Sequence, residues 1–238
     1  MCGRFANSET IPVLAARLGA DLAAGSERWS PSWNVRPTQD APVLLGGTRR
    51  RLGLMTWGWP RGFASGGRLI NARMETAAVK PTFAEALRRR RCIIPAVAYY
   101  EWRRDAADRP IRGGKHAFKA ADGGWLLMAG VWEPAEGPDG VRTAGFIMLT
   151  RAMVRHADIH DRTPVLVTPA VAAEWLDPQA TLDAVQAATQ ACRDEDLVVR
   201  PVCDGPNAKV PTGPHLLAST GEPWPSADTD DGATPTAL

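Results

Sequence analysis

Cys92–Trp102, with the sequence CIIPAVAYYEW, is the stretch of the 238-residue chain that decides the fold. β-branched and aromatic residues dominate it, and such residues fit the pleated, half-buried surface of a strand. Pro95 interrupts the run, because proline cannot donate a hydrogen bond to a neighbouring strand. The pattern therefore predicts two strands broken by a proline, Cys92–Val97 and Tyr99–Trp102.

Further strands are predicted on both sides of this stretch. On its N-terminal side, two apolar runs around Gly46-Gly47 predict a β-hairpin. On its C-terminal side, apolar runs separated by Gly, Asp and Pro turns predict four more strands. Their ranges are Ala117–Ala120, Trp125–Trp132, Gly145–Thr150 and Leu197–Val202.

Helices are predicted between and after these strands. Ser8 has the position of an N-cap for a helix through Leu18, and Thr82 with Glu85 has capping-box spacing. Thr168-Pro169 opens a third helix and Leu182–Cys192 forms a fourth. Because strands and helices do not alternate regularly, we expect one α+β domain, residues 1–222, with a mainly antiparallel, curved or barrel-like sheet. The Pro-, Ser-, Thr- and Asp-rich residues 223–238 predict a disordered acidic tail.

Composition narrows the class of protein. Hydrophobic residues make up 45% of the chain, and no run of about 18 apolar residues is present, so we expect a buried core and no membrane span. The N-terminus lacks the apolar region of a signal peptide. The four cysteines are scattered without a C-x-x-C pair, which argues against a disulfide framework or structural zinc site. We expect a cytoplasmic monomer.

The N-terminus, Met1-Cys2-Gly3-Arg4, carries unusual chemistry. Removal of Met1 would leave Cys2 with a free α-amine and a thiol on adjacent carbons. Such a 1,2-aminothiol condenses with an aldehyde to an imine, and the thiol then closes a thiazolidine ring. The two groups titrate at about 7.7–8.0 and about 8.5 in model compounds, so each is usable near neutrality. The alternative is an ordinary thiol on a frayed chain end.

Two polar side chains follow the strand pattern and suit proton transfer or orientation. Glu101 follows aromatic residues, and burial there raises the pKa of a carboxyl group and makes a general acid; the alternative is an ion pair with Arg73 or Arg103. Asn71 carries an amide that can orient a substrate hydroxyl or an imine nitrogen; the alternative is a cap on the following turn.

His160 is a third candidate. It stands among Asp158, Asp161 and Arg162 just before an apolar strand, which suits proton transfer, with a surface turn histidine as the alternative. His156 has i, i+4 spacing to His160 and could share a metal with it. The absence of a Glu next to His156 and the expected helix end near Asp158 argue against a metal site.

Six short motifs occur in one order along the chain: Met1–Phe5, Asn34–Pro37, Trp57-Gly58, Ile70–Thr76, Tyr99–Trp102 and Ile159–Pro164. In these motifs, and in their order and approximate spacing, the chain resembles the SOS response-associated peptidase (SRAP) family. The resemblance covers residues 2 to about 217 and implies a single α+β domain with a positively charged groove.

The resemblance implies a protein that senses abasic sites in single-stranded DNA and crosslinks to them through its N-terminal cysteine. Cys2 would be the nucleophile, Asn71 would position the sugar, and Glu101 and His160 would move protons, without metal or cofactor. The DNA is implied to be bound by phosphate contacts at Arg4, Arg73 and Arg162, by base stacking at Trp57 and Trp102, and by Asn34 and Lys209. The chain departs from the family at Ala98, where Gly is common, and matches it only partly around Asn207–Gly213.

Three further activities stay open from the sequence. A cysteine peptidase or amidase would use Cys2 with His160 as its base, and its substrate would be the Met1–Cys2 bond. Incidental lyase activity would arise from β-elimination at an imine intermediate. A non-covalent reader of modified bases would leave Cys2 without a role. We favour the crosslinking protein, acting in the cytoplasm in association with the nucleoid.

Overall fold

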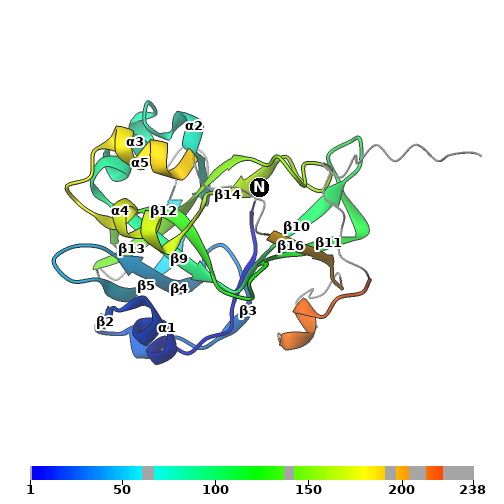
Figure 1. Ribbon diagram of the computed structural model, residues 1–238, viewed down its shortest axis with the longest axis horizontal. Coiled ribbons are helices and arrows are strands. Elements are labelled where there is room, and N and C mark those ends of the chain that lie inside the picture. The colour runs from blue at the N-terminus through cyan, green and yellow to red at the C-terminus, as the bar shows by residue number, and fades with distance from the viewer. Residues whose placement is uncertain (1, 61–66, 137–141, 191–196, 204–212, 222–238) are drawn as a thin grey trace, which may run out of the picture.

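The computed structural model describes residues 2–60, 67–136, 142–190, 197–203 and 213–221. Its centre is a barrel of five strands, each antiparallel to the next along the series β5, β4, β9, β12, β13. β13 then pairs with β5 in parallel, with Phe146 opposite Trp57, and this pairing closes the barrel (Figure 1). The bounds are β4 Asp40–Leu45, β5 Arg51–Trp57, β9 Arg91–Ala96, β12 Leu126–Glu136 and β13 Arg142–Ala152.

Short strands extend the barrel sheet. β8 lies parallel to β13, with Asn71 opposite Met148, and β14 and β15 pair with β13 and β12. The mainly antiparallel, barrel-like α+β fold predicted from the sequence is confirmed, as is the hairpin of β4 and β5 around Gly46-Gly47. The bounds of the extending strands are β2 Asp21–Leu22, β8 Asn71–Arg73, β14 Arg162–Pro164 and β15 Leu166–Val167. β6 Trp59–Pro60 and β7 Arg68–Leu69 form a separate two-stranded sheet.

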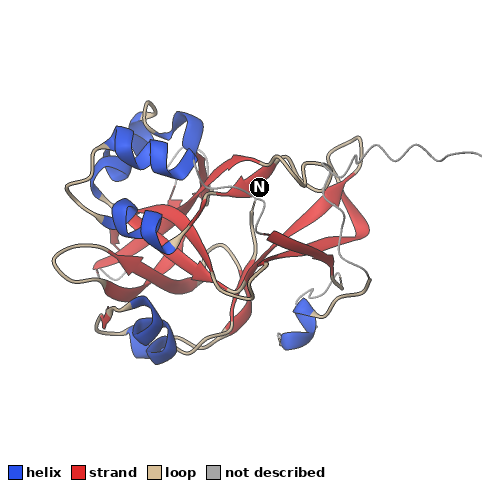
Figure 2. Ribbon diagram, in the orientation of Figure 1, coloured by secondary structure: helices blue, strands red, loops and turns tan. Residues whose placement is uncertain are grey.

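A second sheet, in the order β16-β11-β10-β1-β3, stands beside the barrel (Figure 2). The stretch Cys92–Trp102 contributes to both sheets, since β9 belongs to the barrel and β10 to the second sheet. The break between them falls at Val97 and not at Pro95, which lies inside β9 opposite Leu127. The bounds are β1 Phe5–Asn7, β3 Ser32–Val35, β10 Ala98–Arg104, β11 Pro110–Ala120 and β16 Leu197–Pro201.

The helices flank the sheets, and two of their predicted starts are wrong. α1 begins at Ile11 with Thr10 in the cap position, and α3 begins at Pro81, so Thr82 lies inside it. Proline at the first helical position accounts for the start of α3 at Pro81, earlier than predicted. Thr168 caps α4 as predicted, its Oγ1 accepting from the Val171 amide. The bounds are α1 Ile11–Leu18, α2 Met74–Ala77, α3 Pro81–Arg89, α4 Pro169–Leu176 and α5 Leu182–Gln190, with 3-10 turns η1 Ser26–Arg28 and η2 Pro214–Leu217.

The core has two principal clusters. One packs the helices onto the barrel, and the other fills the space between the barrel and the second sheet. The second cluster includes Cys2, Phe5, Trp57 and Tyr99, so the N-terminal cysteine lies in the protein interior. Within the described residues, no helix is long and apolar enough to cross a membrane. The predicted tail, residues 223–238, lies outside the described residues.

Candidate functional site

Cys2 lies three residues before β1, which pairs with β10 on one side and with β3 on the other. The residue has 0% exposure, and its Sγ donates a hydrogen bond to the Arg4 carbonyl at 3.6 Å. Burial raises the pKa of the thiol well above its ordinary value, and the nearby charge of Glu101 raises it further. The alternative of a thiol on a frayed end is therefore wrong for Cys2.

Asn71 holds the backbone of Cys2. Its Nδ2 donates to the Cys2 carbonyl at 2.7 Å, and the register of β8 on β13 sets its position. Asn71 Oδ1 is buried and accepts no hydrogen bond from the described residues. A buried acceptor without a donor is unfavourable, so this oxygen is suited to a group supplied by the substrate or the freed amine.

Glu101 faces His160 in the same interior. Glu101 Oε2 lies 3.7 Å from His160 Nε2, and the two side chains are 3% and 4% exposed. Burial raises the pKa of Glu101 to about 8 and lowers the pKa of His160 to about 4. Both groups are therefore neutral at pH 7, and Glu101 keeps a proton that it can give away.

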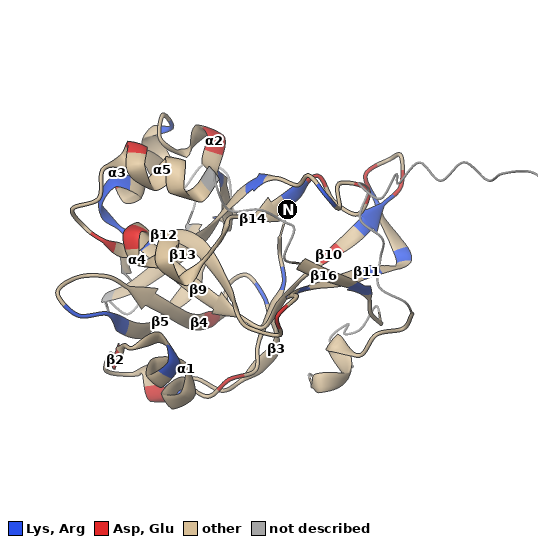
Figure 3. Ribbon diagram, viewed as in Figure 1, with Lys and Arg blue, Asp and Glu red and all other residues tan. Residues whose placement is uncertain are grey.

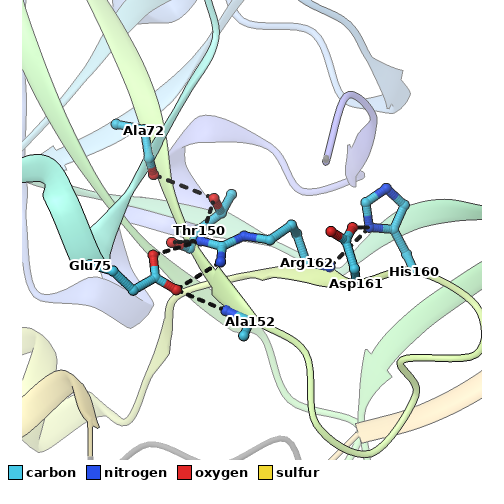
Figure 4. Close-up of polar contacts among 7 residues, drawn as sticks. All are labelled: Ala72, Glu75, Thr150, Ala152, His160, Asp161 and Arg162. Carbon is cyan, nitrogen blue, oxygen red and sulfur yellow. Dashed lines mark hydrogen bonds and ion pairs between the residues drawn. The ribbon is translucent and has the colours of Figure 1, made fainter.

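The His160 ring has a defined tautomer. Its Nδ1 accepts a hydrogen bond from the Arg162 backbone N–H at 3.0 Å (Figure 4). In the neutral ring the proton therefore sits on Nε2, which faces Glu101. Asp161 Oδ1 lies 3.0 Å from the same Nδ1. Protonation of the ring would let Nδ1 donate to Asp161 instead.

Basic side chains lie near these groups. Arg4 Nη1 donates to Asn34 Oδ1 at 2.9 Å, and burial together with the charge of Arg36 lowers the pKa of Arg4. Arg73 is exposed two residues beyond Asn71. Lys and Arg positions also mark β10, β11 and the neighbourhood of β14 (Figure 3). Arg4 and Arg73 therefore stay candidates for phosphate contacts, with Asn34 as the support of Arg4.

Trp57 has a different place from the one predicted. It has 0% exposure, its indole stacks on Phe146 with an interplanar angle of 8°, and its Nε1 donates to the Ile70 carbonyl. A base cannot reach either face of this ring, so the predicted base-stacking role is wrong for Trp57. Trp102 is half-buried, with Lys115 Nζ 5.6 Å from its ring centroid, and its stacking role stays a prediction.

Arg162 is also placed differently. Its guanidinium makes two hydrogen bonds to the Glu75 carboxylate, at 2.7 and 2.8 Å, and one to the Thr150 carbonyl at 2.7 Å. Arg162 is 8% exposed, and its positive charge is paired with the Glu75 carboxylate. These hydrogen bonds lower the pKa of Glu75 to about 2. The structure thus pairs Arg162 with a half-exposed carboxylate of the protein, and the phosphate contact predicted for Arg162 stays a prediction.

Two other predictions concern residues beside or beyond the site. Within the described residues, no group of three His, Cys, Asp or Glu side chains is arranged to hold a metal ion, and the His156 ring meets Phe118 edge-on. Lys209 lies outside the described residues.

Sequence reasoning missed two polar residues, the buried His116 and the half-exposed Glu75. His116 is directly opposite Glu101 in the antiparallel pairing of β10 and β11, and its Nδ1 donates to the Gly114 carbonyl. Alternation with buried Phe118 along β11 is the signal that places His116 on the inner face. Glu75 was quoted only as part of a motif, and no local pattern in the sequence pairs it with a residue 87 positions away.

Comparison with known proteins gives consistent matches. The family described as SOS response associated peptidase (SRAP) matches residues 1–207. The abasic site processing protein YoqW of Bacillus subtilis is 32% identical over 92% of this chain and 100% of its own length. The abasic site processing protein YedK of Escherichia coli is 31% identical over 81% and 87%.

Solved structures agree on the fold. A protein from Bacteroides thetaiotaomicron superposes with a TM-score of 0.77 at 20% identity, over 92% of this chain and 99% of the other. A phage-related protein from Bordetella bronchiseptica gives a TM-score of 0.68 at 25% identity, over 84% and 94%.

Proposed function

Because the chain belongs to the SOS response associated peptidase family, we propose that it senses and shields abasic sites in single-stranded DNA by bonding to them covalently through Cys2. The observation that carries the proposal is the convergence of Asn71 and Glu101 on the Cys2 end of the chain. Asn71 donates to the Cys2 carbonyl, and Glu101 lies near enough to Cys2 that its ionised form raises the pKa of the thiol. A neutral acid and an orienting amide thus accompany a latent 1,2-aminothiol.

The reaction starts with hydrolysis of the Met1–Cys2 bond, which frees the Cys2 amine. Glu101, protonated at neutral pH, gives its proton to the ring oxygen of the abasic deoxyribose as the sugar opens to its aldehyde. The amine adds to the aldehyde carbon, and the adduct loses water to become an imine. His160 and Glu101 exchange the protons of these steps.

The thiol completes the crosslink. A C–S bond forms between Cys2 Sγ and the imine carbon, and the thiol proton passes to the nitrogen, giving a thiazolidine with no change of oxidation state. One water is lost overall. The imine also acidifies the neighbouring carbon, so loss of the 3′ phosphate from that intermediate gives an incidental lyase activity.

DNA binding is assigned to the exposed basic and aromatic groups. Arg4 and Arg73 contact phosphates, with Asn34 holding Arg4, and Trp102 stacks on an unpaired base. Base stacking is worth about 1–3 kcal/mol per base and does not depend on sequence, which suits a detector of missing bases. A cytoplasmic monomer that reaches the nucleoid through DNA accords with these contacts.

A peptidase mechanism is less favoured by the charges of the site. A Cys–His nucleophile works as a thiolate beside an imidazolium, which needs a lowered cysteine pKa. Here burial raises the pKa of Cys2 and lowers the pKa of His160 to about 4, so both shifts oppose that ion pair. Cys2 Sγ also directs its hydrogen bond to the Arg4 carbonyl. Peptide cleavage, on this view, extends no further than the Met1–Cys2 bond.

The test is to incubate the mature protein with a single-stranded oligonucleotide that holds one abasic site and to weigh the product. We expect one adduct per protein with a mass equal to the two reactants less one water. A form whose Cys2 amine is acetylated should give none. Full crosslinking by the acetylated form would exclude the mechanism, and repeated turnover of a peptide substrate would favour the peptidase.

A further inference from the structure

The Glu75 carboxylate joins three elements. Glu75, in α2, accepts two hydrogen bonds from the Arg162 guanidinium in β14 and one from the Ala152 amide in β13 at 3.1 Å (Figure 4). Ala152 and Arg162 are direct partners in the antiparallel pairing of β13 and β14. We call this arrangement the Glu75–Arg162 clamp. It holds two strands together at the point where β14 begins.

The clamp reaches the strand that carries Asn71. Arg162 Nη2 donates to the Thr150 carbonyl at 2.7 Å and to Thr150 Oγ1 at 3.3 Å. Thr150 Oγ1 in turn donates to the Ala72 carbonyl at 3.4 Å, in β8, one residue after Asn71. Thr150 is fully buried and the Arg162 side chain is 10% exposed, whereas the Glu75 side chain is 48% exposed, so the network is shielded from water at its inner end.

The clamp also reaches His160. The residue whose side chain enters the clamp, Arg162, is the residue whose backbone N–H donates to His160 Nδ1 at 3.0 Å. The neighbouring turn is fixed from the other side, since the Met153 amide donates to the Asp161 carbonyl at 2.9 Å. The position of Arg162 therefore acts on both the orientation of the His160 ring and the choice of the nitrogen that carries the proton.

We propose that Glu75 and Arg162 are positioning residues for the crosslinking reaction: their ion pair keeps His160 in the Nε2–H tautomer that faces Glu101. This inference deepens the proposed function and rests on it. It assigns Arg162 a role inside the protein in place of a contact with the DNA backbone. Neither residue touches the reacting atoms, so both act through His160.

The surroundings of His160 indicate what loss of the clamp should change. Glu101 and Arg104 approach the ring from β10, Asp161 and Arg162 belong to its own turn, and the positive amino terminus of the chain also acts on it. Burial is the largest cause of the lowered pKa of His160. A ring released toward solvent should therefore regain a pKa nearer the ordinary value of about 6.5.

The decisive measurement observes His160 without DNA. ¹⁵N NMR of the histidine rings gives the tautomer and the pKa of His160 in the wild type and in Glu75→Gln. We expect the wild type to hold the proton on Nε2, and Glu75→Gln to show mixed tautomers with an upward shift of the His160 pKa. An unchanged tautomer and pKa in Glu75→Gln would overturn the proposal. Because no DNA is present, the result does not depend on whether the protein crosslinks abasic sites.

Glu133→Gln is the matched control. Glu133 lies in β12 and forms a partly buried ion pair with Arg90 at 2.6 Å. Its replacement by glutamine is the same chemical change as Glu75→Gln, made outside the clamp. We expect this variant to leave the His160 tautomer and pKa as in the wild type. An equal shift in both variants would show a general effect of losing a carboxylate and would count against the clamp.

A kinetic test covers the case in which Glu75→Gln does not fold. Arg162→Lys keeps the positive charge but cannot make the bidentate pair of hydrogen bonds with the Glu75 carboxylate. We expect a crosslinking rate at saturating abasic DNA lower by about tenfold to 100-fold, with the affinity for intact single-stranded DNA changed less than about twofold. A large loss of affinity with an unchanged rate would make Arg162 a phosphate contact and would overturn the proposal.

Discussion

Glu101 Oε2 and His160 Nε2 lie 3.7 Å apart in a part of the interior that admits almost no solvent. Burial shifts their pKa values in opposite directions, to about 8 and about 4. The pair is therefore neutral over the range between these values, with the proton on the carboxyl group. Divergent shifts in two neighbouring groups are typical of acid–base sites, and they assign the acid role to Glu101.

Glu101→Gln should slow the crosslinking reaction. The amide keeps the shape of the side chain but has no proton to give, and general acid catalysis contributes about 10²–10⁴-fold to a rate. We expect a loss of about 100-fold at pH 7 in a gel assay of adduct formation with an abasic oligonucleotide. In the wild type the rate should also fall as the pH rises through about 8, where Glu101 loses its proton.

The control for this prediction is the pH profile of the same variant. Without Glu101 the fall near pH 8 should vanish, because glutamine does not titrate. Glu85→Gln, on the exposed face of α3, should behave as the wild type. A wild-type rate that keeps rising above pH 8 would remove Glu101 from the acid role.

Cys2→Ser separates the two nucleophiles of the N-terminus. Serine retains the α-amine after Met1 removal, so the imine should still form, but an alcohol is a much weaker nucleophile for ring closure. We expect no stable adduct without reductant and an adduct with borohydride, which reduces the imine to an amine. Mass spectrometry of the two reactions checks this. A stable adduct of Cys2→Ser without borohydride would show that the thiol is dispensable.

Asn71→Ala should disturb both the chain end and the chemistry. The change removes the side-chain amide that donates to the Cys2 carbonyl at 2.7 Å, so a buried carbonyl loses its hydrogen bond from Asn71. We expect a cost of about 1–3 kcal/mol in the free energy of unfolding by urea, and a crosslinking rate lower by at least about tenfold. Asn7→Ala provides a comparison, because the Asn7 side chain also donates a buried hydrogen bond to a backbone carbonyl, that of Pro95, and its loss should affect stability alone.

The salt dependence of DNA binding distinguishes arginines that contact phosphates from arginines that pair with carboxylates of the protein. Each phosphate contact to a single strand contributes about 0.7 to the slope of log K against log salt concentration. We expect Arg73→Gln to weaken binding to intact single-stranded DNA and to lower the slope by about that amount. Arg49→Gln, whose arginine pairs with Asp21 on the surface of another region, should leave the slope unchanged. Equal slopes for Arg73→Gln and the wild type would show that Arg73 makes no phosphate contact with the DNA.

The sequence predicts individual strands and hairpins better than the strand pairing that closes the barrel. Residue type alone indicates the strands around Pro95 and the hairpin at Gly46-Gly47, since these depend on neighbours in the chain. The parallel pairing of Phe146 with Trp57 joins residues far apart in sequence, and no local pattern encodes it. The position of the break at Val97 follows from the same tertiary demand, because the chain leaves one sheet for another there.

The site shows the same division. Motif membership assigned Asn71, Glu101 and His160 to one reaction, but it did not say which way each side chain points. Trp57 shares a face of β5 with buried Met55, so strand alternation predicts its burial better than its motif does. The pairing of Arg162 with Glu75 depends on the meeting of β14 with α2, which only the folded chain supplies.

Glu101 and His160 should also leave opposite marks on the pH dependence of stability. The folded protein keeps the Glu101 proton between about pH 4.5 and 8 while the unfolded chain loses it, so the free energy of unfolding falls as the pH rises through that window. His160 behaves in the opposite way between about pH 4 and 6.5, because there the unfolded chain binds the proton and the folded protein does not. The two slopes oppose each other below pH 6.5, and the Glu101 slope, at most about 1.4 kcal/mol per pH unit, stands alone above it.

Urea unfolding measures both effects. From pH 6.5 to 8 the free energy of unfolding of Glu101→Gln should therefore change less with pH than that of the wild type. For His160→Gln it should show a decline that begins near pH 4.5. Profiles of both variants that run parallel to the wild type would contradict the shifted pKa values on which the acid role of Glu101 rests.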